Sequence, residues 1–419
     1  MSTDILRLLA RDRAEGQPFG ITSVCSAHPL VIEAALLEAL EQGGDVLIEA
    51  TCNQVNQEGG YTGMGPAEFR DFVHGIADRV GLASERIILG GDHLGPNPWK
   101  HLPAETAMQR AEEMIAAYAA SGYEKLHLDC SMGCAGEPAA LADELTATRA
   151  ARLAARAEAS APALPVYIIG TEVPTPGGAT EALDHLVPTE AGAVQATYDV
   201  HERAFRDIAP GAWSRVVAMV VQPGVEFGHE DVVIYRPDAA RELAATLTGL
   251  PGLVFEAHST DYQPEAALRR LVLDGFPILK VGPGLTFALR ETLYGLDAIA
   301  AAMLPTATRL PAGMEALMLA EPKHWQSHYP GTPDEQRLLR HYSYSDRIRY
   351  YWPDPRARAA TDALMQLLGD TRLSETLISQ YLPRFYDRVM TGALTPDART
   401  LLIEAVRDVL RIYARACAA

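Results

Sequence analysis

The feature that most constrains the fold is a recurring unit: a short apolar run, a polar segment directly after it, and a stretch with helical periodicity. The apolar runs are near-continuous, as expected for strands buried on both faces of a parallel sheet. Eight occur, at residues 19–24, 46–48, 87–90, 125–128, 166–169, 216–221, 253–255 and 278–281. Helix-like stretches separate them, notably at 30–42, 66–80, 104–121, 138–159, 191–208, 238–247 and 264–273. The alternation predicts an α/β fold of the (β/α)8 TIM barrel type.

An open, doubly wound sheet is the competing architecture. It is less favoured because the strand count reaches eight and no Gly-x-Gly-x-x-Gly turn follows the first strand. After about residue 303 the pattern changes to helical stretches and an aromatic, basic segment at 341–353. No Pro-, Ser- or Gly-rich linker marks a boundary. We therefore expect a barrel over residues 1–303 and a helical extension over 304–419 packed on it.

Composition limits the function classes. The 419 residues carry a formal net charge of −18, which argues against nucleic acid or an anionic membrane as a partner. The five cysteines are too few and too scattered for a disulfide framework or a zinc knuckle. The N-terminal stretch has no signal-peptide plan and no apolar run approaches membrane-spanning length. A cytoplasmic protein is expected.

The strand ends carry the candidate chemistry. The run 87–90 leads into Gly91, Asp92 and His93, and we expect this strand to deliver the acid and the imidazole to a loop at its carboxyl end. In a parallel barrel, residues that follow different strands converge on one site. The candidates collected in this way are Glu49, Asp92, His93, Asp129, Glu172, His229, His258 and Lys280.

Three histidines and a glutamate on separate loops suit a divalent metal of the zinc type. The predicted ligands are His93, Glu172, His229 and His258. Two simpler interpretations remain open, since Asp92 and His93 could form a hydrogen-bonded turn and His229 could lie in a solvated turn. The remaining histidines are interpreted as structural or surface residues: His28, His74, His101, His127, His185, His201, His324, His328 and His341.

An anion site is predicted after the last strand. Backbone N–H groups at Gly282 and Gly284 open a helix there, and Lys280 and Ser259 lie near it, so the segment could hold a phosphate. A plain strand-to-helix turn is the alternative. Arg347 and Arg349 could reach a second anionic group or pack the extension, and packing is slightly favoured.

Several stretches together resemble one known family. They are SVCSAHP at 23–29, EAT at 49–51, NQVNQ at 53–57, GGYTGM at 59–64, GGDHLGPN at 90–97, GTEVP at 170–174, QPGVEF at 222–227, EAHSTDYQ at 256–263 and SDRIRYYWP at 345–353. The chain resembles the Z-type subunit family of class II D-tagatose-1,6-bisphosphate aldolase over essentially its whole length. The resemblance implies a metal-aldolase-like barrel, in agreement with the strand count.

The resemblance also implies roles for residues. An Asp-His pair in class II aldolases supplies an acid and a metal ligand, and Asp92-His93 matches it. Glu172, His229 and His258 fall in the order of the remaining ligands. Some family members are known as non-catalytic subunits that support a separate aldolase chain, whereas others resemble stand-alone 4-epimerases of D-tagatose 6-phosphate or of free tagatose.

The expected activity is metal-dependent C4 epimerisation of D-tagatose 6-phosphate to D-fructose 6-phosphate by retro-aldol cleavage and re-addition. Asp92 is assigned the proton transfer, with Asp129 or Glu49 as its partner. The alternatives are an accessory subunit of a catalytic aldolase chain and the aldolase itself. A hydride mechanism lacks a nicotinamide fingerprint, and a sugar kinase lacks a nucleotide loop. A homo-oligomer is expected.

Overall fold

A closed barrel of parallel strands forms the centre of the computed structural model, which describes residues 4–170, 186–304 and 309–418. The strand order around the barrel is β1-β10-β9-β6-β5-β4-β3-β2. The strands are β1 (Ile21–Cys25), β2 (Val46–Thr51), β3 (Ile87–Leu94), β4 (Lys125–Leu128), β5 (Val166–Ile169), β6 (Val216–Val220), β9 (Val254–Ala257) and β10 (Ile278–Val281). The predicted TIM barrel is confirmed.

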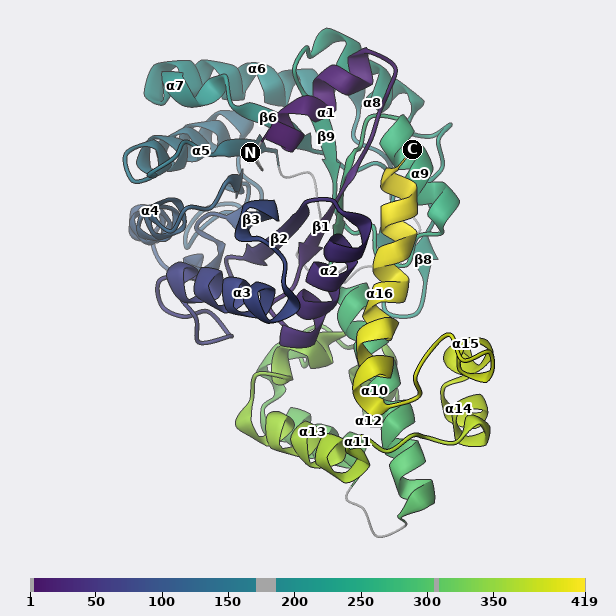
Figure 1. Ribbon diagram of the computed structural model, residues 1–419. Coiled ribbons are helices and arrows are strands. Elements are labelled where there is room, and N and C mark those ends of the chain that lie inside the picture. The colour runs from purple at the N-terminus through teal and green to yellow at the C-terminus, as the bar shows by residue number, and fades with distance from the viewer. Residues whose placement is uncertain (1–3, 171–185, 305–308, 419) are drawn as a thin grey trace.

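Helices cover the outside of the barrel (Figure 1). They are α2 (Pro29–Gln42), α3 (Pro66–Val80), α4 (Ala104–Ala120), α5 (Asp143–Glu158), α6 (Ala191–Ile208), α7 (Pro210–Trp213), α8 (Arg241–Ala245), α9 (Glu265–Leu273) and α10 (Pro283–Met303). Short 3-10 turns are η1 (Ser84–Arg86), η2 (Asn97–Trp99) and η4 (Thr246–Gly249). Their ends follow local chemistry: the His28 ring accepts the Leu30 N–H at the start of α2, and left-handed Gly43 ends it.

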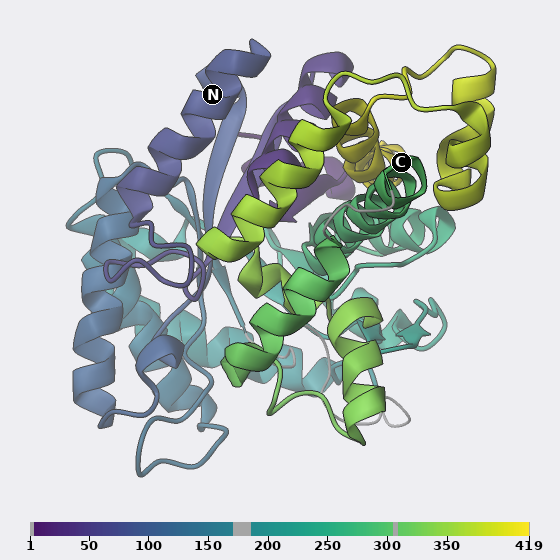
Figure 2. The same ribbon diagram turned by 90° about the horizontal axis from the view of Figure 1, so that it is seen from below.

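The C-terminal helices gather at one end of the barrel (Figures 1 and 2). They are α11 (Leu310–Ala320), α12 (Pro333–Tyr342), α13 (Pro355–Leu368), α14 (Glu375–Tyr381), α15 (Tyr386–Met390) and α16 (Ala398–Cys417), with 3-10 turns η5 (Pro322–His324), η6 (Arg347–Tyr351) and η7 (Pro383–Phe385). The last helix, α16, returns along the barrel and packs against α2, α9 and α10, so it joins the outer helical layer. No helix in the described ranges combines the length and the apolar character needed to cross a membrane.

The opposite end of the barrel is closed by α1 (Asp4–Ala14). Leu6 and Leu9 of this helix belong to one buried apolar cluster with inward side chains of the strands, among them Leu47, Ile88 and Val254. Because this end is filled with apolar side chains, the charged residues that line the barrel cavity, Asp92 and Lys280 among them, lie toward the carboxyl ends of the strands. That is the end at which barrel enzymes place their active sites.

Two local features differ from the sequence-based expectation. Strand β3 continues to Leu94, so Asp92 and His93 lie within the strand and not in a loop after it. The β3–β4 register shifts between Gly91 and Leu94, and His93 has a left-handed φ of 49°. A bulge of this kind redirects side chains at a barrel rim. In addition, β7 (Glu226–Phe227) and β8 (Val232–Val233) form a small antiparallel hairpin that the sequence patterns did not predict.

Candidate active site

The polar residues at the carboxyl ends of the strands surround a small inner cavity of about 90 Å³. Asp92, His93, His258 and Lys280 line this cavity. A second, outer cavity of about 700 Å³ lies between the barrel end and the extension. The two share lining residues: Cys25, Gln54, Tyr61, Gly282 and Arg349. The site therefore consists of a small polar cavity that adjoins a wider cavity, and residues of the extension line part of the wider one.

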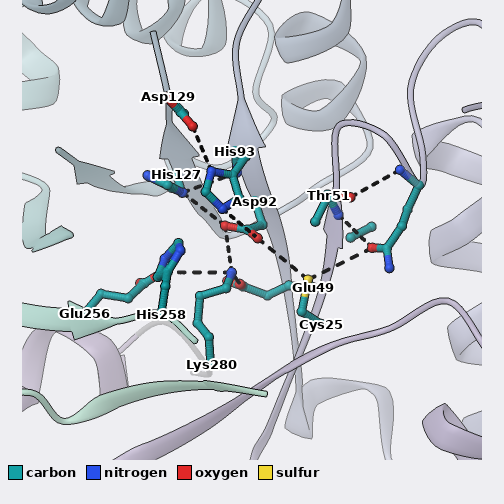
Figure 3. Close-up of polar contacts among 12 residues, drawn as sticks. Cys25, Glu49, Thr51, Asp92, His93, His127, Asp129, Glu256, His258 and Lys280 are labelled. Atoms are coloured by element: carbon teal, nitrogen blue, oxygen red, sulfur yellow. Dashed lines mark hydrogen bonds and ion pairs between the residues drawn. The ribbon is translucent and has the colours of Figure 1, made fainter. Parts of the chain in front are cut away.

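Beneath the inner cavity, acids and lysines alternate in a buried network. Figure 3 labels four of its members, Glu49, Asp92, Glu256 and Lys280. Lys125 Nζ lies 2.5 Å from Glu49 Oε1 and 2.8 Å from Glu256 Oε2. Lys280 Nζ lies 2.5 Å from Glu49 Oε2 and 2.6 Å from Asp92 Oδ1. All five side chains are buried. Each charge has opposite charges as neighbours, which is the condition under which charges are tolerated away from water.

This network keeps Asp92 ionised. Burial by itself raises the pKa of a carboxyl group, but the charges of His93 and Lys280 outweigh burial and hold the pKa of Asp92 well below its usual range. Lys280 responds in the opposite sense, because Asp92 and Glu49 overcome the effect of burial and raise its pKa. A carboxylate and an ammonium group therefore face each other at neutral pH.

His127 completes the surroundings of Asp92. Its Nδ1 lies 3.0 Å from Asp92 Oδ1, and its Nε2 lies 3.1 Å from the Gly170 carbonyl oxygen. His127 is among the histidines expected to be structural or surface residues; it is fully buried inside the barrel and belongs to the cluster that could bind a metal. The sequence of β4 contains a hint of this position, because Lys125 and His127 alternate with leucines. Alternate residues of a strand point to the same side, so the two polar side chains share one face.

His93 and His258 each have one ring nitrogen held by a carboxylate. His93 Nδ1 lies 2.7 Å from Asp129 Oδ2, and His258 Nε2 lies 2.9 Å from Glu256 Oε1. Apart from a 3.8 Å approach of His93 Nε2 to Asp92, the other ring nitrogens have no hydrogen-bond partner in the part of the chain that the structure describes. The two ring centroids are 4.9 Å apart. Carboxylates behind imidazoles orient metal-binding histidines in this way.

The arrangement fits a divalent metal. Ligand atoms of Asp92, His93, His127 and His258 lie within 4.8 Å of one another. Burial lowers the pKa of His258 to about 3, which keeps its ring neutral and able to bind a metal. At His93, burial is outweighed by Asp92 and Asp129, which raise the pKa, so a metal would have to displace a proton there. This buried cluster could therefore bind a metal ion.

One predicted ligand, His229, is not brought into this cluster. His229 lies in the β7–β8 hairpin, where its Nε2 is 3.0 Å from the His328 carbonyl oxygen and its Nδ1 is 3.3 Å from Ser343 Oγ. Its ring packs edge-on against Tyr329, so it joins the hairpin to the extension. Glu172 lies outside the described residues.

The predicted partner acids of Asp92 have different neighbours. Asp129 contacts His93 and not Asp92, and although burial opposes it, the bond to His93 lowers the pKa of Asp129 to about 2. Glu49 binds Lys125 and Lys280 and does not line the inner cavity. In this geometry both acids hold other functional side chains in place, and of these three acids it is Asp92 that lines the cavity.

The predicted phosphate-binding segment is already engaged. The N–H groups of Gly282 and Gly284 donate to Asp261 Oδ1 at 3.0 and 2.7 Å. Ser259 lines the cavity with a left-handed φ of 53°, and Lys280 points to the acids below. The two backbone N–H groups that were predicted to bind a phosphate therefore bind the side chain of Asp261 in the structure.

Arg347 and Arg349 of η6 have different surroundings. Arg347 donates to the His324 carbonyl oxygen and lines neither cavity, which is the packing role that the sequence analysis favoured. Arg349 lines both cavities. It lies over the Tyr350 ring, with 4.4 Å between the guanidinium carbon and the ring centroid.

Comparisons with known proteins cover nearly the whole chain. Residues 6–418 match the family model described as D-tagatose-1,6-bisphosphate aldolase subunit GatZ/KbaZ-like. A D-tagatose 6-phosphate 4-epimerase from Agrobacterium fabrum is 53% identical over 418 residues, which is 98% of each chain. A crystal structure described as a probable tagatose 6 phosphate kinase from Sinorhizobium meliloti 1021 is 59% identical, with a TM-score of 0.90, and covers 95% of this chain and 100% of its own.

Proposed function

This chain belongs to the D-tagatose-1,6-bisphosphate aldolase subunit GatZ/KbaZ-like family, and we propose that it is a metal-dependent 4-epimerase of D-tagatose 6-phosphate. The observation that carries the proposal is the clustering, within 4.8 Å, of ligand atoms from an ionised, cavity-facing carboxylate, Asp92, and two carboxylate-backed histidines, His93 and His258. The name of the Agrobacterium fabrum relative supports the choice of substrate and reaction.

The proposed reaction begins at the C4 hydroxyl group of the sugar. Asp92 Oδ1 is occupied by Lys280 and His127, whereas the hydrogen-bond donor at Oδ2 is the weak Cys25 thiol at 3.6 Å, so we assign Oδ2 the C4–OH proton. The C3–C4 bond then breaks to give an aldehyde fragment and the enediolate of the three-carbon ketose. The aldehyde turns to present its other face, the C3–C4 bond forms again, and Asp92 returns the proton. No atom is gained or lost, and C4 is inverted.

His93 and His258 would hold the divalent metal, for which Zn²⁺ is our expectation, together with further ligands such as Glu172. When bound there, the metal supplies Lewis-acid stabilisation of the negative charge that develops on the sugar oxygens. Asp129 and Glu256 keep the two rings oriented. Lys280 and His127 fix Asp92 and keep it ionised. The small inner cavity confines the cleaved fragments between cleavage and re-addition.

The purified chain tests the proposal. It is stripped of metal, reloaded with Zn²⁺ and supplied with D-tagatose 6-phosphate, and D-fructose 6-phosphate and triose phosphate are both followed. We expect fructose 6-phosphate as the main product, and only after metal is restored. Triose phosphate as the main product would favour the aldolase. No turnover, together with activation of a separate class II aldolase chain, would replace the proposal with the accessory-subunit role.

A further inference from the structure

Charge pairing distinguishes the two cations that line the inner cavity. Lys280 is neutralised by Glu49 and Asp92. Arg349 has no carboxylate within ion-pair distance among the residues of the described ranges. The nearby Asp346 carboxylate binds Thr286 Oγ1 at 2.6 Å and lies 3.6 Å from Arg290 instead. Arg349 therefore lines the cavity wall without a direct ion pair of its own.

The Arg349 head group is nevertheless fixed in place. Nη1 donates to the carbonyl oxygens of Ser345 and Asp346, and Nη2 donates to the Tyr350 hydroxyl at 2.9 Å. All of these acceptors are neutral, and a guanidinium group has more N–H donors than they use. A pre-oriented guanidinium group with free donors is suited to a phosphate, which it binds through paired hydrogen bonds.

The barrel's own anion position is closed to such a ligand. Asp261 Oδ1 accepts the N–H groups of Gly282 and Gly284, so a phosphate would have to displace a buried carboxylate to reach them. Arg349 needs no such displacement. It lines the inner cavity together with Asp92 and also borders the outer cavity. A hexose phosphate with C4 at Asp92 carries its phosphate a few bonds away, toward that wider space.

We propose that Arg349 binds the phosphate of a ketohexose 6-phosphate, so that the helical extension, and not the barrel, selects phosphorylated over free sugar. This inference rests on the proposed function, because it takes C4 of the sugar to lie at Asp92. Arg347 is the matched control, since it belongs to the same turn η6 but lines neither cavity.

The test compares binding of D-fructose 6-phosphate and D-fructose by calorimetry in the metal-loaded full chain. We expect Arg349→Gln to weaken fructose 6-phosphate binding by about 10- to 100-fold, the usual range for a charge-assisted contact, and to leave fructose binding unchanged. Arg349→Lys should retain part of the fructose 6-phosphate affinity, because lysine keeps the positive charge but lacks the paired N–H donors of the guanidinium group. Arg347→Gln should change the ratio of the two affinities little.

Thermal unfolding of each variant establishes that it is folded before binding is compared. Equal weakening of both sugars in Arg349→Gln, or no weakening of either, would overturn the inference, as would a wild-type protein that does not distinguish the two sugars. The proposed function fails separately: selective, Arg349-dependent binding without epimerisation would sustain the phosphate contact and refute the activity. Epimerisation with an unchanged KM in Arg349→Gln would sustain the activity and refute the phosphate contact.

Discussion

Nζ of Lys280 lies 2.6 Å from Oδ1 of Asp92, inside the barrel and beneath the cavity. Lys280 is expected from the sequence to lie near a phosphate, but its position makes it the counter-ion of the carboxylate to which we assign the proton transfer. Because Glu49 shares the same ammonium group, Lys280 links the candidate base to the buried network of Lys125 and Glu256.

Removal of that ammonium group should be severe. Lys280→Met leaves Asp92 and Glu49 buried without their shared cation, and breaking a buried ion pair in this way costs about 3–5 kcal/mol of unfolding free energy. We expect a lower midpoint of chemical unfolding and loss of epimerase activity. Lys100→Met, at an exposed lysine, is the control and should change neither. A Lys280→Met protein as stable and active as the wild type would contradict the network's role.

His127 should act on activity through Asp92 and not through metal content. His127→Asn removes the imidazole ring that joins Asp92 to the Gly170 carbonyl oxygen, and misplacement of a reacting group can cost about 100-fold in kcat. Bound metal, measured by elemental analysis, should remain because His93 and His258 are intact. His201→Asn provides a control at a buried histidine that binds only the Thr197 carbonyl oxygen. Loss of metal in His127→Asn would instead make His127 a ligand.

Metal content should separate the predicted ligands. His93→Ala and His258→Ala should abolish bound metal. Asp129→Asn and Glu256→Gln should weaken metal affinity by about 10- to 100-fold, which is the usual effect of removing a carboxylate that orients a metal-binding histidine. His229→Ala should retain metal, because its ring nitrogens face His328 and Ser343. Unchanged metal in His93→Ala would refute the proposed site, and metal loss in His229→Ala would show that the hairpin moves to the cluster.

Asp261 should give the fold a pH dependence. Burial raises its pKa to about 6 even though the Gly284 and Gly282 N–H groups oppose the shift. The folded state therefore holds this proton more tightly than the unfolded chain does, and stability falls as pH rises from about 4 through about 6, by up to about 3 kcal/mol. Asp261→Asn should flatten this part of the unfolding free energy against pH. A parallel curve for the variant would show that Asp261 does not cause the fall.

The barrel was predictable because buried parallel strands have a local signature. The runs at 125–128, 166–169 and 278–281 match β4, β5 and β10 at both ends. The β3 bulge was not predictable, because nothing in Gly91-Asp92-His93 distinguishes a loop from a strand that shifts register with β4. The β7–β8 hairpin is too short to leave a periodic pattern.

The site was predicted in part. Asp92, His93 and His258 do meet, since the first two lie near the end of β3 and His258 directly follows β9. Which carboxylate binds which histidine ring depends on side-chain directions inside the barrel. The pairs Asp129–His93 and Glu256–His258 could therefore not be assigned from sequence spacing. His229 is predicted as a ligand because it lies in a segment after a strand and matches the order of the family's ligands, and neither fact fixes the direction of its ring.

The most direct test of the central claim is the fate of the hydrogen on C4. Metal-loaded enzyme is incubated with D-tagatose 6-phosphate in D₂O, and the D-fructose 6-phosphate formed is examined by NMR. If Asp92 takes the hydroxyl proton and the C3–C4 bond breaks, C4 keeps its original hydrogen through the inversion, and the product carries protium there. Deuterium at C4 would mean that a C–H bond was broken instead, and would contradict the assignment of Asp92, His93 and His258 to a retro-aldol epimerase.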